Sequence, residues 1–290
     1  MKVLLAKTLI LIIGLLPLGL ARALGAFIGE LNYLLNSKGA QVAVTNIRLC
    51  FPELSAGQQQ RLVRASMREW GKTFFETPVV WQRSEDWLRR HIVHSTNQQL
   101  MDRCLSGDKG IIMIAPHLGN WEALGLHIAK IIQMTCLYQP PRQQELEALV
   151  KKARSRSGTK LAPTNRRGVI ALVKALREGE LTGILPDQVP QQGAGVFAPF
   201  FGVPTLTMTL LQNLLKSTGA TPIVAAAKRV PGGFEIIYME PDQQIYAEDP
   251  VVAASALNRC VEQIVRLFPE QYQWEYKRFK KRPEGEPKVY

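Results

Sequence analysis

The stretch that most constrains the fold of this chain is Gly110-Ile-Ile-Met-Ile-Ala-Pro-His-Leu-Gly-Asn-Trp-Glu122. Its residues from Ile111 to Ala115 are all apolar and are bounded by a glycine and a proline, which is typical of a strand buried on both faces. A glycine then interrupts the chain, and Asn120 is suited to cap a following helix. The pattern predicts a strand, a tight turn and a helix. Turns of this kind lie at the carboxyl end of the sheet, where α/β proteins place reactive groups.

Two ionisable residues of this stretch, His117 and Glu122, are candidates for acid–base chemistry. On one ideal helix they would point roughly 140° away from each other, so they can converge only if His117 lies in the turn before the helix. A neutral imidazole held by a carboxylate can take a proton from an alcohol, which is the general-base step of acyl transfer. From spacing alone, a structural histidine and a solvated glutamate remain the alternative.

The segment from His117 to Glu122 also fits a His-x4-Asp/Glu motif, and other short blocks accompany it along the chain. They are Asn46-Ile-Arg-Leu-Cys-Phe-Pro-Glu53, Asn165-Arg166, Pro186-Asp187-Gln188, Phe197-Ala-Pro-Phe-Phe-Gly202, Pro269-Glu-Gln-Tyr-Gln-Trp274 and Arg278-Phe-Lys-Lys-Arg-Pro283. In this motif and in the order of these blocks, the chain resembles the bacterial lipid A biosynthesis acyltransferases. These are lauroyl and myristoyl transferases of the lysophospholipid acyltransferase-like superfamily.

The resemblance implies an enzyme that transfers a fatty acyl chain from acyl carrier protein to a hydroxyl of a lipid A precursor, in the secondary acylation of lipopolysaccharide biosynthesis. His117 would be the general base and Glu122 would hold its tautomer, while Arg166 or backbone N–H groups would stabilise the oxyanion. We expect direct transfer because no serine or cysteine of the sequence sits in a nucleophile elbow. No metal and no cofactor are expected, since the donor is itself a substrate.

We predict that Arg166, Asp187 and Asn120 bind substrate. Arg166 opens an expected helix, where a cation is unfavourable unless an anion lies nearby, and it aligns with a functional arginine of the family. Asp187 follows an expected strand from Leu181 to Leu185; carboxylates at strand ends often bind substrate, although turns also use aspartate. Many relatives carry a second acidic residue where this chain has Val189.

The N-terminal region is apolar enough to suggest a membrane segment. Val3 to Leu20 is interrupted only by a lysine and a threonine, and its eighteen residues are near the lower limit for a spanning helix. A cleaved signal peptide with a site at Ala21-Arg-Ala23, a retained anchor and a buried core helix all fit this pattern. We favour the retained anchor because apolar residues resume from Leu24 to Leu35, as in a helix that lies on a bilayer surface.

Residues 1–38 are therefore assigned to an N-terminal membrane anchor and interfacial helix, and residues 39–290 to a catalytic domain. In line with the family, we expect the protein at the bacterial inner membrane, with the catalytic domain on the cytoplasmic face. Its net charge of +12 suits anionic inner-membrane lipids and an acidic carrier protein as partners. A nucleic-acid partner is not expected because no known binding module is visible. The four cysteines are scattered singly, without zinc spacing.

For the fold class, we predict an α/β protein with a central mixed β-sheet flanked by helices and an N-terminal membrane-anchoring helix, as in the glycerolipid acyltransferases. A helix is expected from Thr205 to Thr218, and the aromatic run from Phe197 to Pro204 is either a wall of a lipid channel or core packing. Two other functions remain open. One is acyl transfer to another glycolipid or phospholipid, and the other is an inactive, basic, membrane-bound binding protein.

Overall fold

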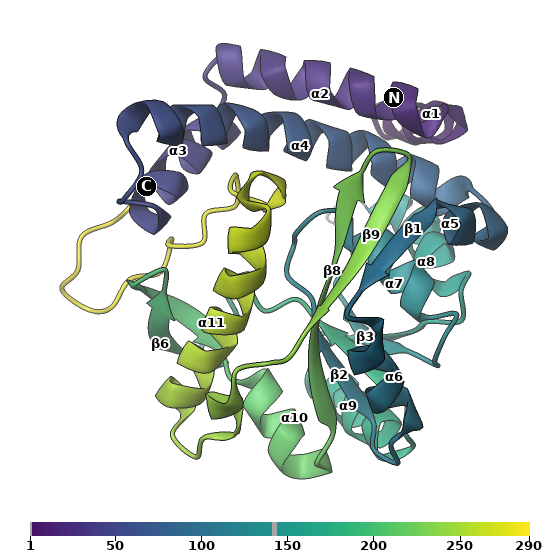
Figure 1. Cartoon of the computed structure of the whole chain (residues 1–290), viewed down its shortest axis with the longest axis vertical. Coiled ribbons are helices and arrows are strands. Elements are labelled where there is room, and N and C mark those ends of the chain that lie inside the picture. The colour runs from purple at the N-terminus through teal and green to yellow at the C-terminus, as the bar shows by residue number, and fades with distance from the viewer. Residues whose placement is uncertain (1, 141–143) are drawn as a thin grey trace.

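The computed structural model describes residues 2–140 and 144–290, and its centre is a mixed five-stranded sheet (Figure 1). The strand order is β1-β9-β8-β2-β5. The strands are β1 (Ile92–Thr96), β2 (Ile111–Ile114), β5 (Leu181–Ile184), β8 (Thr221–Val230) and β9 (Gly233–Met239). Only β8 and β9 are antiparallel, whereas β1 and β9, β8 and β2, and β2 and β5 pair in parallel. The predicted α/β fold with a mixed central sheet is thus confirmed.

Two smaller sheets and a set of helices surround this centre. The smaller sheets are β3 (Thr135–Tyr138) with β4 (Lys160–Pro163), in parallel, and β6 (Gly195–Phe200) with β7 (Val203–Met208), antiparallel. The helices are α1 (Lys2–Leu15), α2 (Leu18–Leu34), α3 (Lys38–Cys50), α4 (Ala56–Gln82), α5 (Glu85–His91), α6 (Gln98–Ser106), α7 (Trp121–Ile128), α8 (Glu147–Ser155), α9 (Arg166–Arg177), α10 (Leu210–Thr218) and α11 (Pro250–Leu267). Short 3-10 turns lie at Gln144–Leu146, Gln243–Tyr246 and Pro269–Gln271.

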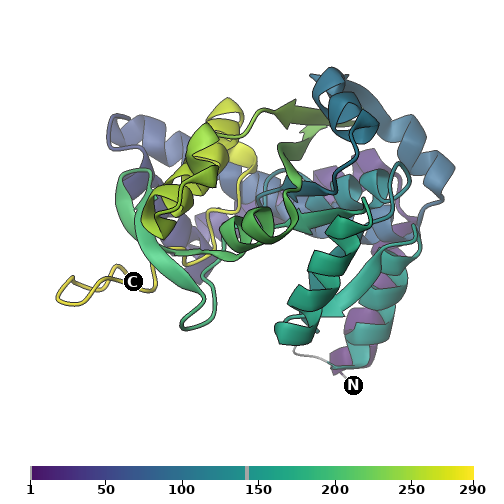
Figure 2. The same cartoon turned by 90° about the horizontal axis from the view of Figure 1, so that it is seen from below.

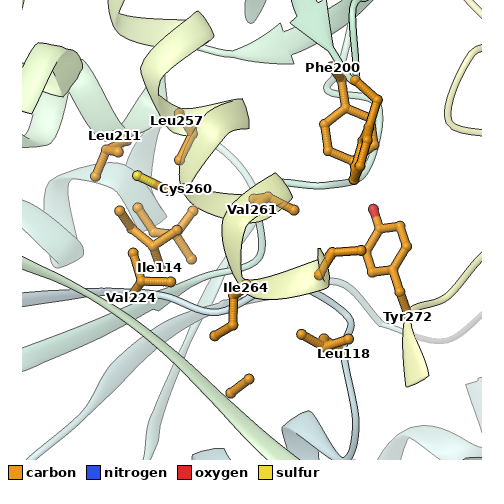
Figure 3. Packing of buried hydrophobic residues seen from close by; sticks show 14 of the residues in the cluster. Ile114, Leu118, Phe200, Leu211, Val224, Leu257, Cys260, Val261, Ile264 and Tyr272 are labelled. Atoms are coloured by element: carbon orange, nitrogen blue, oxygen red, sulfur yellow. The ribbon is translucent and has the colours of Figure 1, made fainter. Parts of the chain in front are cut away.

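Strand β2 is apolar throughout because both faces of the sheet are covered. Ile112 and Ile114 belong to one core cluster, which also contains residues of α3, α9, α10 and α11 (Figure 3). Ile111 and Met113 belong to a second cluster, with residues of α5, α6 and α7. Since successive side chains of a strand point to opposite faces, the apolar run seen in the sequence supplies both cores at once.

The aromatic run after Phe197 is part of a hairpin rather than a loop, and it packs into the core. Phe200 and Phe201 are buried, and their rings contact those of Tyr272 and Trp274. Core packing is therefore the interpretation that the structure supports, and the channel wall is not. The helix expected from Thr205 is shorter than predicted, because the hairpin strand β7 continues to Met208.

The N-terminal region forms two helices, which differs from the single spanning helix expected over residues 3–20. α1 ends at Leu15, and α2 begins at Leu18, directly after Pro17. Proline lacks an N–H donor and its ring clashes with the preceding turn, so it ends the first helix here. Within residues 2–140 and 144–290, no helix combines the length and the apolarity needed to cross a membrane.

Helices α2 and α4 pack with their backbones in close contact, as the two upper helices of Figure 1 show. A Cβ atom added at Gly71 would overlap the carbonyl oxygen of Gly25, and one added at Gly29 would overlap that of Met67. Only glycine allows this approach, so these positions fix how α2 lies on α4. Figure 2 shows that the C-terminal tail and the N-terminal helix lie at opposite sides of the molecule.

Gly71→Ala is expected to lower the free energy of unfolding by about 1–3 kcal/mol, because the new methyl group must push α2 away from α4. Chemical denaturation measures this change. Gly57→Ala is the matched control: Gly57 lies on the same helix and is exposed, and a Cβ there would make only an ordinary contact with the side chain of Arg61, at 3.7 Å. We expect the control to be neutral or stabilising by up to about 1 kcal/mol. Equal stability of Gly71→Ala and the wild type would contradict this account of the packing.

Candidate active site

The site forms where the turn after β2 meets the loop after β5. Because β2 and β5 are parallel neighbours, their carboxyl ends lie side by side. Oδ2 of Asp187 accepts a hydrogen bond from the backbone N–H of His117 at 2.8 Å, and Oδ1 lies 2.9 Å from Nδ1 of the same residue. Asp187 is buried and His117 is partly so. One carboxylate therefore holds both the backbone and the ring of the histidine.

This pairing decides which ring nitrogen of His117 can accept a proton. A carboxylate on Nδ1 favours the tautomer with hydrogen on Nδ1, so Nε2 carries the lone pair. Nε2 lies 3.2 Å from the side-chain nitrogen of Gln188, which can donate to it. Burial alone would raise the pKa of Asp187, but the attraction and hydrogen bonds of His117 outweigh burial and hold the pKa below its usual value.

Glu122 does not hold the tautomer of His117, which corrects the pairing expected from the His-x4-Glu motif. Its carboxylate accepts hydrogen bonds from Nε of Arg154 at 3.2 Å and from the indole N–H of Trp81 at 2.9 Å. Glu122 lies in the first turn of α7, facing α8 and α4, and not in the turn that carries His117. The structure thus gives Asp187 the contact that was predicted for Glu122.

Asn120 also has a different place from the substrate contact predicted for it. Its side chain is fully buried, where Oδ1 accepts from the backbone N–H of Ala123 at 2.9 Å and Nδ2 donates to Glu76 at 3.2 Å. The first bond caps α7, as the sequence predicted. With both of its side-chain groups engaged inside the protein, Asn120 holds the turn and does not face a ligand.

A buried network of charges lies behind this turn. Glu76 of α4 is fully buried and pairs with Arg22 of α2 and with Arg229 of β8, whose Nε lies 2.8 Å from it. Arg229 also pairs with Glu69. Breaking a buried pair of this kind typically costs about 3–5 kcal/mol, since the remaining charge has no partner. The network thus fixes α2, α4 and β8 around the start of α7.

The segment after α11 supports the turn from the opposite side. The backbone N–H of Gly119 donates to the carbonyl of Gln271 at 3.0 Å, and the N–H of Gln273 donates to the carbonyl of His117 at 3.1 Å. Further along, the side chain of Asn46 donates to the carbonyl of Trp274 at 2.7 Å. The segment from Gln271 to Gln273 thus meets the turn at His117, and Asn46 anchors the continuation of that segment.

Two cavities meet at His117. The first, of about 440 Å³, is mostly apolar and is lined by residues of α1 and α4, including Ile13, Phe74 and Trp81, and by the segment from Gln271 to Glu275. The second, of about 470 Å³, lies between α7, β3 and β5 and contains Arg154. A histidine between two cavities can act on two molecules, each held in its own cavity.

Arg166 is exposed at the first residue of α9, and Asn165 caps that helix. In the part of the chain that the structure describes, Arg166 is not among the residues that line either cavity, whereas Arg154 lines the second. Arg154 was missed in the sequence because it is one of several basic residues on an amphipathic helix. Gln188 could have been noticed as the neighbour of Asp187.

Cys136 is the cysteine that lines the second cavity. Burial raises the pKa of Cys136 to about 11, so it stays a neutral thiol and a poor nucleophile. Across residues 2–140 and 144–290, no cluster of at least three His, Cys, Asp or Glu residues is placed to bind a metal ion. The geometry supports proton transfer by His117 and the binding of two substrates.

The sequence was also compared with known proteins. Residues 2–281 match the family described as bacterial lipid A biosynthesis acyltransferase. Among curated proteins, the chain is 27% identical over 278 residues to the lipid A biosynthesis palmitoleoyltransferase of Escherichia coli K12, covering 95% of this chain and 90% of the relative. It is 28% identical over 281 residues to the lauroyltransferase of the same organism, with the same coverage. The myristoyltransferase of that organism is 24% identical over 277 residues, covering 92% and 82%.

Proposed function

Because the chain belongs to the bacterial lipid A biosynthesis acyltransferase family and is therefore an acyltransferase, we propose that it moves a fatty acyl chain from acyl carrier protein to a hydroxyl of a lipid A precursor. The observation that carries this proposal is the His117–Asp187 pair at the junction of two cavities. A direct transfer from an acyl donor to a lipid acceptor needs one base and two binding spaces, and this arrangement offers both. No cofactor enters the proposed reaction.

In the proposed reaction, Nε2 of His117 takes the proton of the acceptor hydroxyl while its oxygen attacks the thioester carbonyl of the donor. The buried carboxylate of Asp187 stabilises the imidazolium that forms. The tetrahedral intermediate then collapses, the C–S bond breaks, and His117 returns the proton to the leaving thiolate. The products are an ester of the acceptor and the free thiol of the carrier, so atoms and charge balance without a covalent enzyme intermediate.

The second cavity is the proposed donor side. It contains the guanidinium of Arg154, which Glu122 holds in place and which can stabilise a developing oxyanion or bind a phosphate of the carrier arm. Exposed basic residues lie on the same helix and at the start of α9, namely Lys151, Lys152, Arg166 and Arg167. An acidic carrier protein would be attracted to them. In this proposal Glu122 acts on the reaction through Arg154, and Arg166 contacts the carrier at the surface.

The first cavity is the proposed acceptor side, because its wall includes Leu9, one of the exposed apolar residues of the N-terminal helices. On α2, exposed apolar residues form a stripe in which they recur every three or four positions: Leu20, Leu24, Phe27, Leu31 and Leu34. On α1, Leu9, Leu11, Ile12 and Leu15 are also exposed, and Leu9 lines the cavity. Exposed apolar surface of this extent suits a membrane interface. We infer that residues 1–38 attach the protein to the cytoplasmic face of the inner membrane, where the lipid acceptor is found.

The function is tested by acyl transfer from acyl carrier protein to a lipid A precursor, with detergent-solubilised enzyme. His117→Ala is expected to lower turnover by about 10²–10⁴-fold, since the general base is lost. His94→Ala is the matched control, because His94 is exposed on β1 and outside both cavity linings within the described residues. Near-normal transfer by His117→Ala would rule out the mechanism. Faster transfer to another glycolipid or phospholipid in the same assay would show that the acceptor is a different lipid. The proposed role of His117 would then still hold.

Attachment to membranes is tested by flotation with vesicles of anionic phospholipids. The double variant Phe27→Ser, Leu31→Ser removes two apolar side chains from the exposed stripe of α2 and is expected to weaken vesicle binding by at least tenfold. Val251→Ser is the control, since Val251 is exposed on α11, away from this stripe. Equal flotation of the wild type and the double variant would show that this stripe does not contact the membrane.

A further inference from the structure

The first cavity has one polar wall, formed by the turn after α11. Trp274 packs into the core, while Gln273 and Glu275 on either side of it line the cavity. Both side chains therefore border the same space. The hydrogen bond from the N–H of Gln273 to the carbonyl of His117 at 3.1 Å fixes this wall next to the histidine.

The oxygens of this wall are buried without partners. Both carboxylate oxygens of Glu275 and Oε1 of Gln273 are inaccessible to solvent, and none has a hydrogen-bond partner among the described residues. The backbone N–H of Glu275 and the Gln273 amide lie close enough to the carboxylate to lower the pKa of Glu275, but neither makes a hydrogen bond of good geometry to it. Burial is the stronger effect and raises the pKa of Glu275 to about 7. Unpartnered buried polar atoms are costly and uncommon in native proteins.

Other polar groups of the cavity wall are already engaged. The hydroxyl of Thr77 donates to the carbonyl of Thr73 at 2.9 Å, and that of Thr73 accepts from Arg229 at 2.6 Å. The indole N–H of Trp81 donates to Glu122. Glu275 and Gln273 carry unpartnered acceptor oxygens in this wall, and such oxygens call for a ligand with O–H or N–H donors.

The rest of the cavity defines the ligand further. Most of its wall is apolar, with Ile10, Ile13, Trp70 and Phe74 among the lining residues. A saturated acyl chain fits such a wall but carries no hydrogen-bond donor. The fitting ligand is thus an apolar molecule that bears hydroxyl or amide N–H groups close to His117.

We propose that Glu275, together with Gln273, binds a hydroxyl or amide N–H of the acyl acceptor next to the hydroxyl that His117 deprotonates. The proposal rests on the proposed function and adds a residue that selects the acceptor. The unpartnered carboxylate is satisfied only when the acceptor is bound, so its burial favours binding of a donor-bearing lipid over a plain hydrocarbon chain. The amide groups of the carrier arm have the same chemistry, but the donor is assigned to the cavity that contains Arg154.

The proposal is tested by equilibrium binding of a lipid A precursor to the full chain, in a His117→Ala background that prevents turnover. Adding Glu275→Leu is expected to weaken the affinity by about 10–100-fold, because hydrogen bonds to the carboxylate are lost. Glu275→Gln keeps one acceptor oxygen, so its affinity for the precursor should lie between those of the protein with Glu275 and the Glu275→Leu variant. Glu284→Leu is the matched control, since Glu284 is exposed in the C-terminal tail.

Stability separates a binding role from a structural one. Glu275→Leu removes an unpartnered buried carboxylate, so its midpoint of thermal unfolding is expected to stay the same or to rise. In the enzyme that retains His117, the same substitution should raise the KM for the acceptor and leave the KM for acyl carrier protein within about twofold. A rise in the KM for the carrier alone would overturn the assignment of this cavity to the acceptor.

The binding experiment distinguishes a failure of the proposed function from a failure of the role of Glu275. If the His117→Ala protein does not bind the lipid A precursor at all, the proposed function itself is wrong. If it binds the precursor equally well with and without the Glu275→Leu substitution, the role of Glu275 is overturned and the proposed function stands.

Discussion

The arrangement of the site depends on one carboxylate that binds two groups of the same histidine. Asp187 accepts hydrogen bonds from the backbone N–H and from Nδ1 of His117, at 2.8 and 2.9 Å. It thereby joins the turn after β2 to the loop after β5 and leaves Nε2 directed at the ligand space. Charge-assisted bonds in a buried setting are stronger than neutral ones. The pairing of two parallel strands, β2 and β5, brings these residues together across 70 positions of sequence.

The surrounding fold keeps this turn in place before any substrate arrives. On one side, Asn120 connects the start of α7 to the buried Glu76, which Arg22 and Arg229 also contact. On the other side, the segment from Gln271 to Gln273 is hydrogen-bonded to the backbone of the turn. A base that is fixed in this way needs little reorganisation during the reaction. The buried charges of Glu76, Arg22 and Arg229 lie behind the turn and do not line either cavity.

Local patterns in the sequence predicted the strand, the turn and the helix around His117, because the apolar run of β2 and the cap at Asn120 are short-range signals. Pro17 was an equally local signal that the first helix ends before it. The apolar composition of the region favoured one continuous helix instead. What the sequence could not supply is the choice of partner. Glu122 is close to His117 in the chain, yet strand pairing gives the contact to Asp187, and Arg154 carries no local signal at all.

The most direct test of the central claim is the pH–rate profile and turnover of Asp187→Asn, compared with the wild type and with Asp86→Asn. Asp86 is an exposed aspartate on α5 and controls for the chemical change. If Asp187 holds the tautomer and stabilises the imidazolium, Asp187→Asn should remain folded and lose about 10³-fold or more of its turnover. The acidic limb of the profile, where the general base becomes protonated, should also move to lower pH, because a neutral amide no longer stabilises the imidazolium. Turnover and profile close to those of the wild type would show that Asp187 does not govern His117, and the account of the site would be wrong.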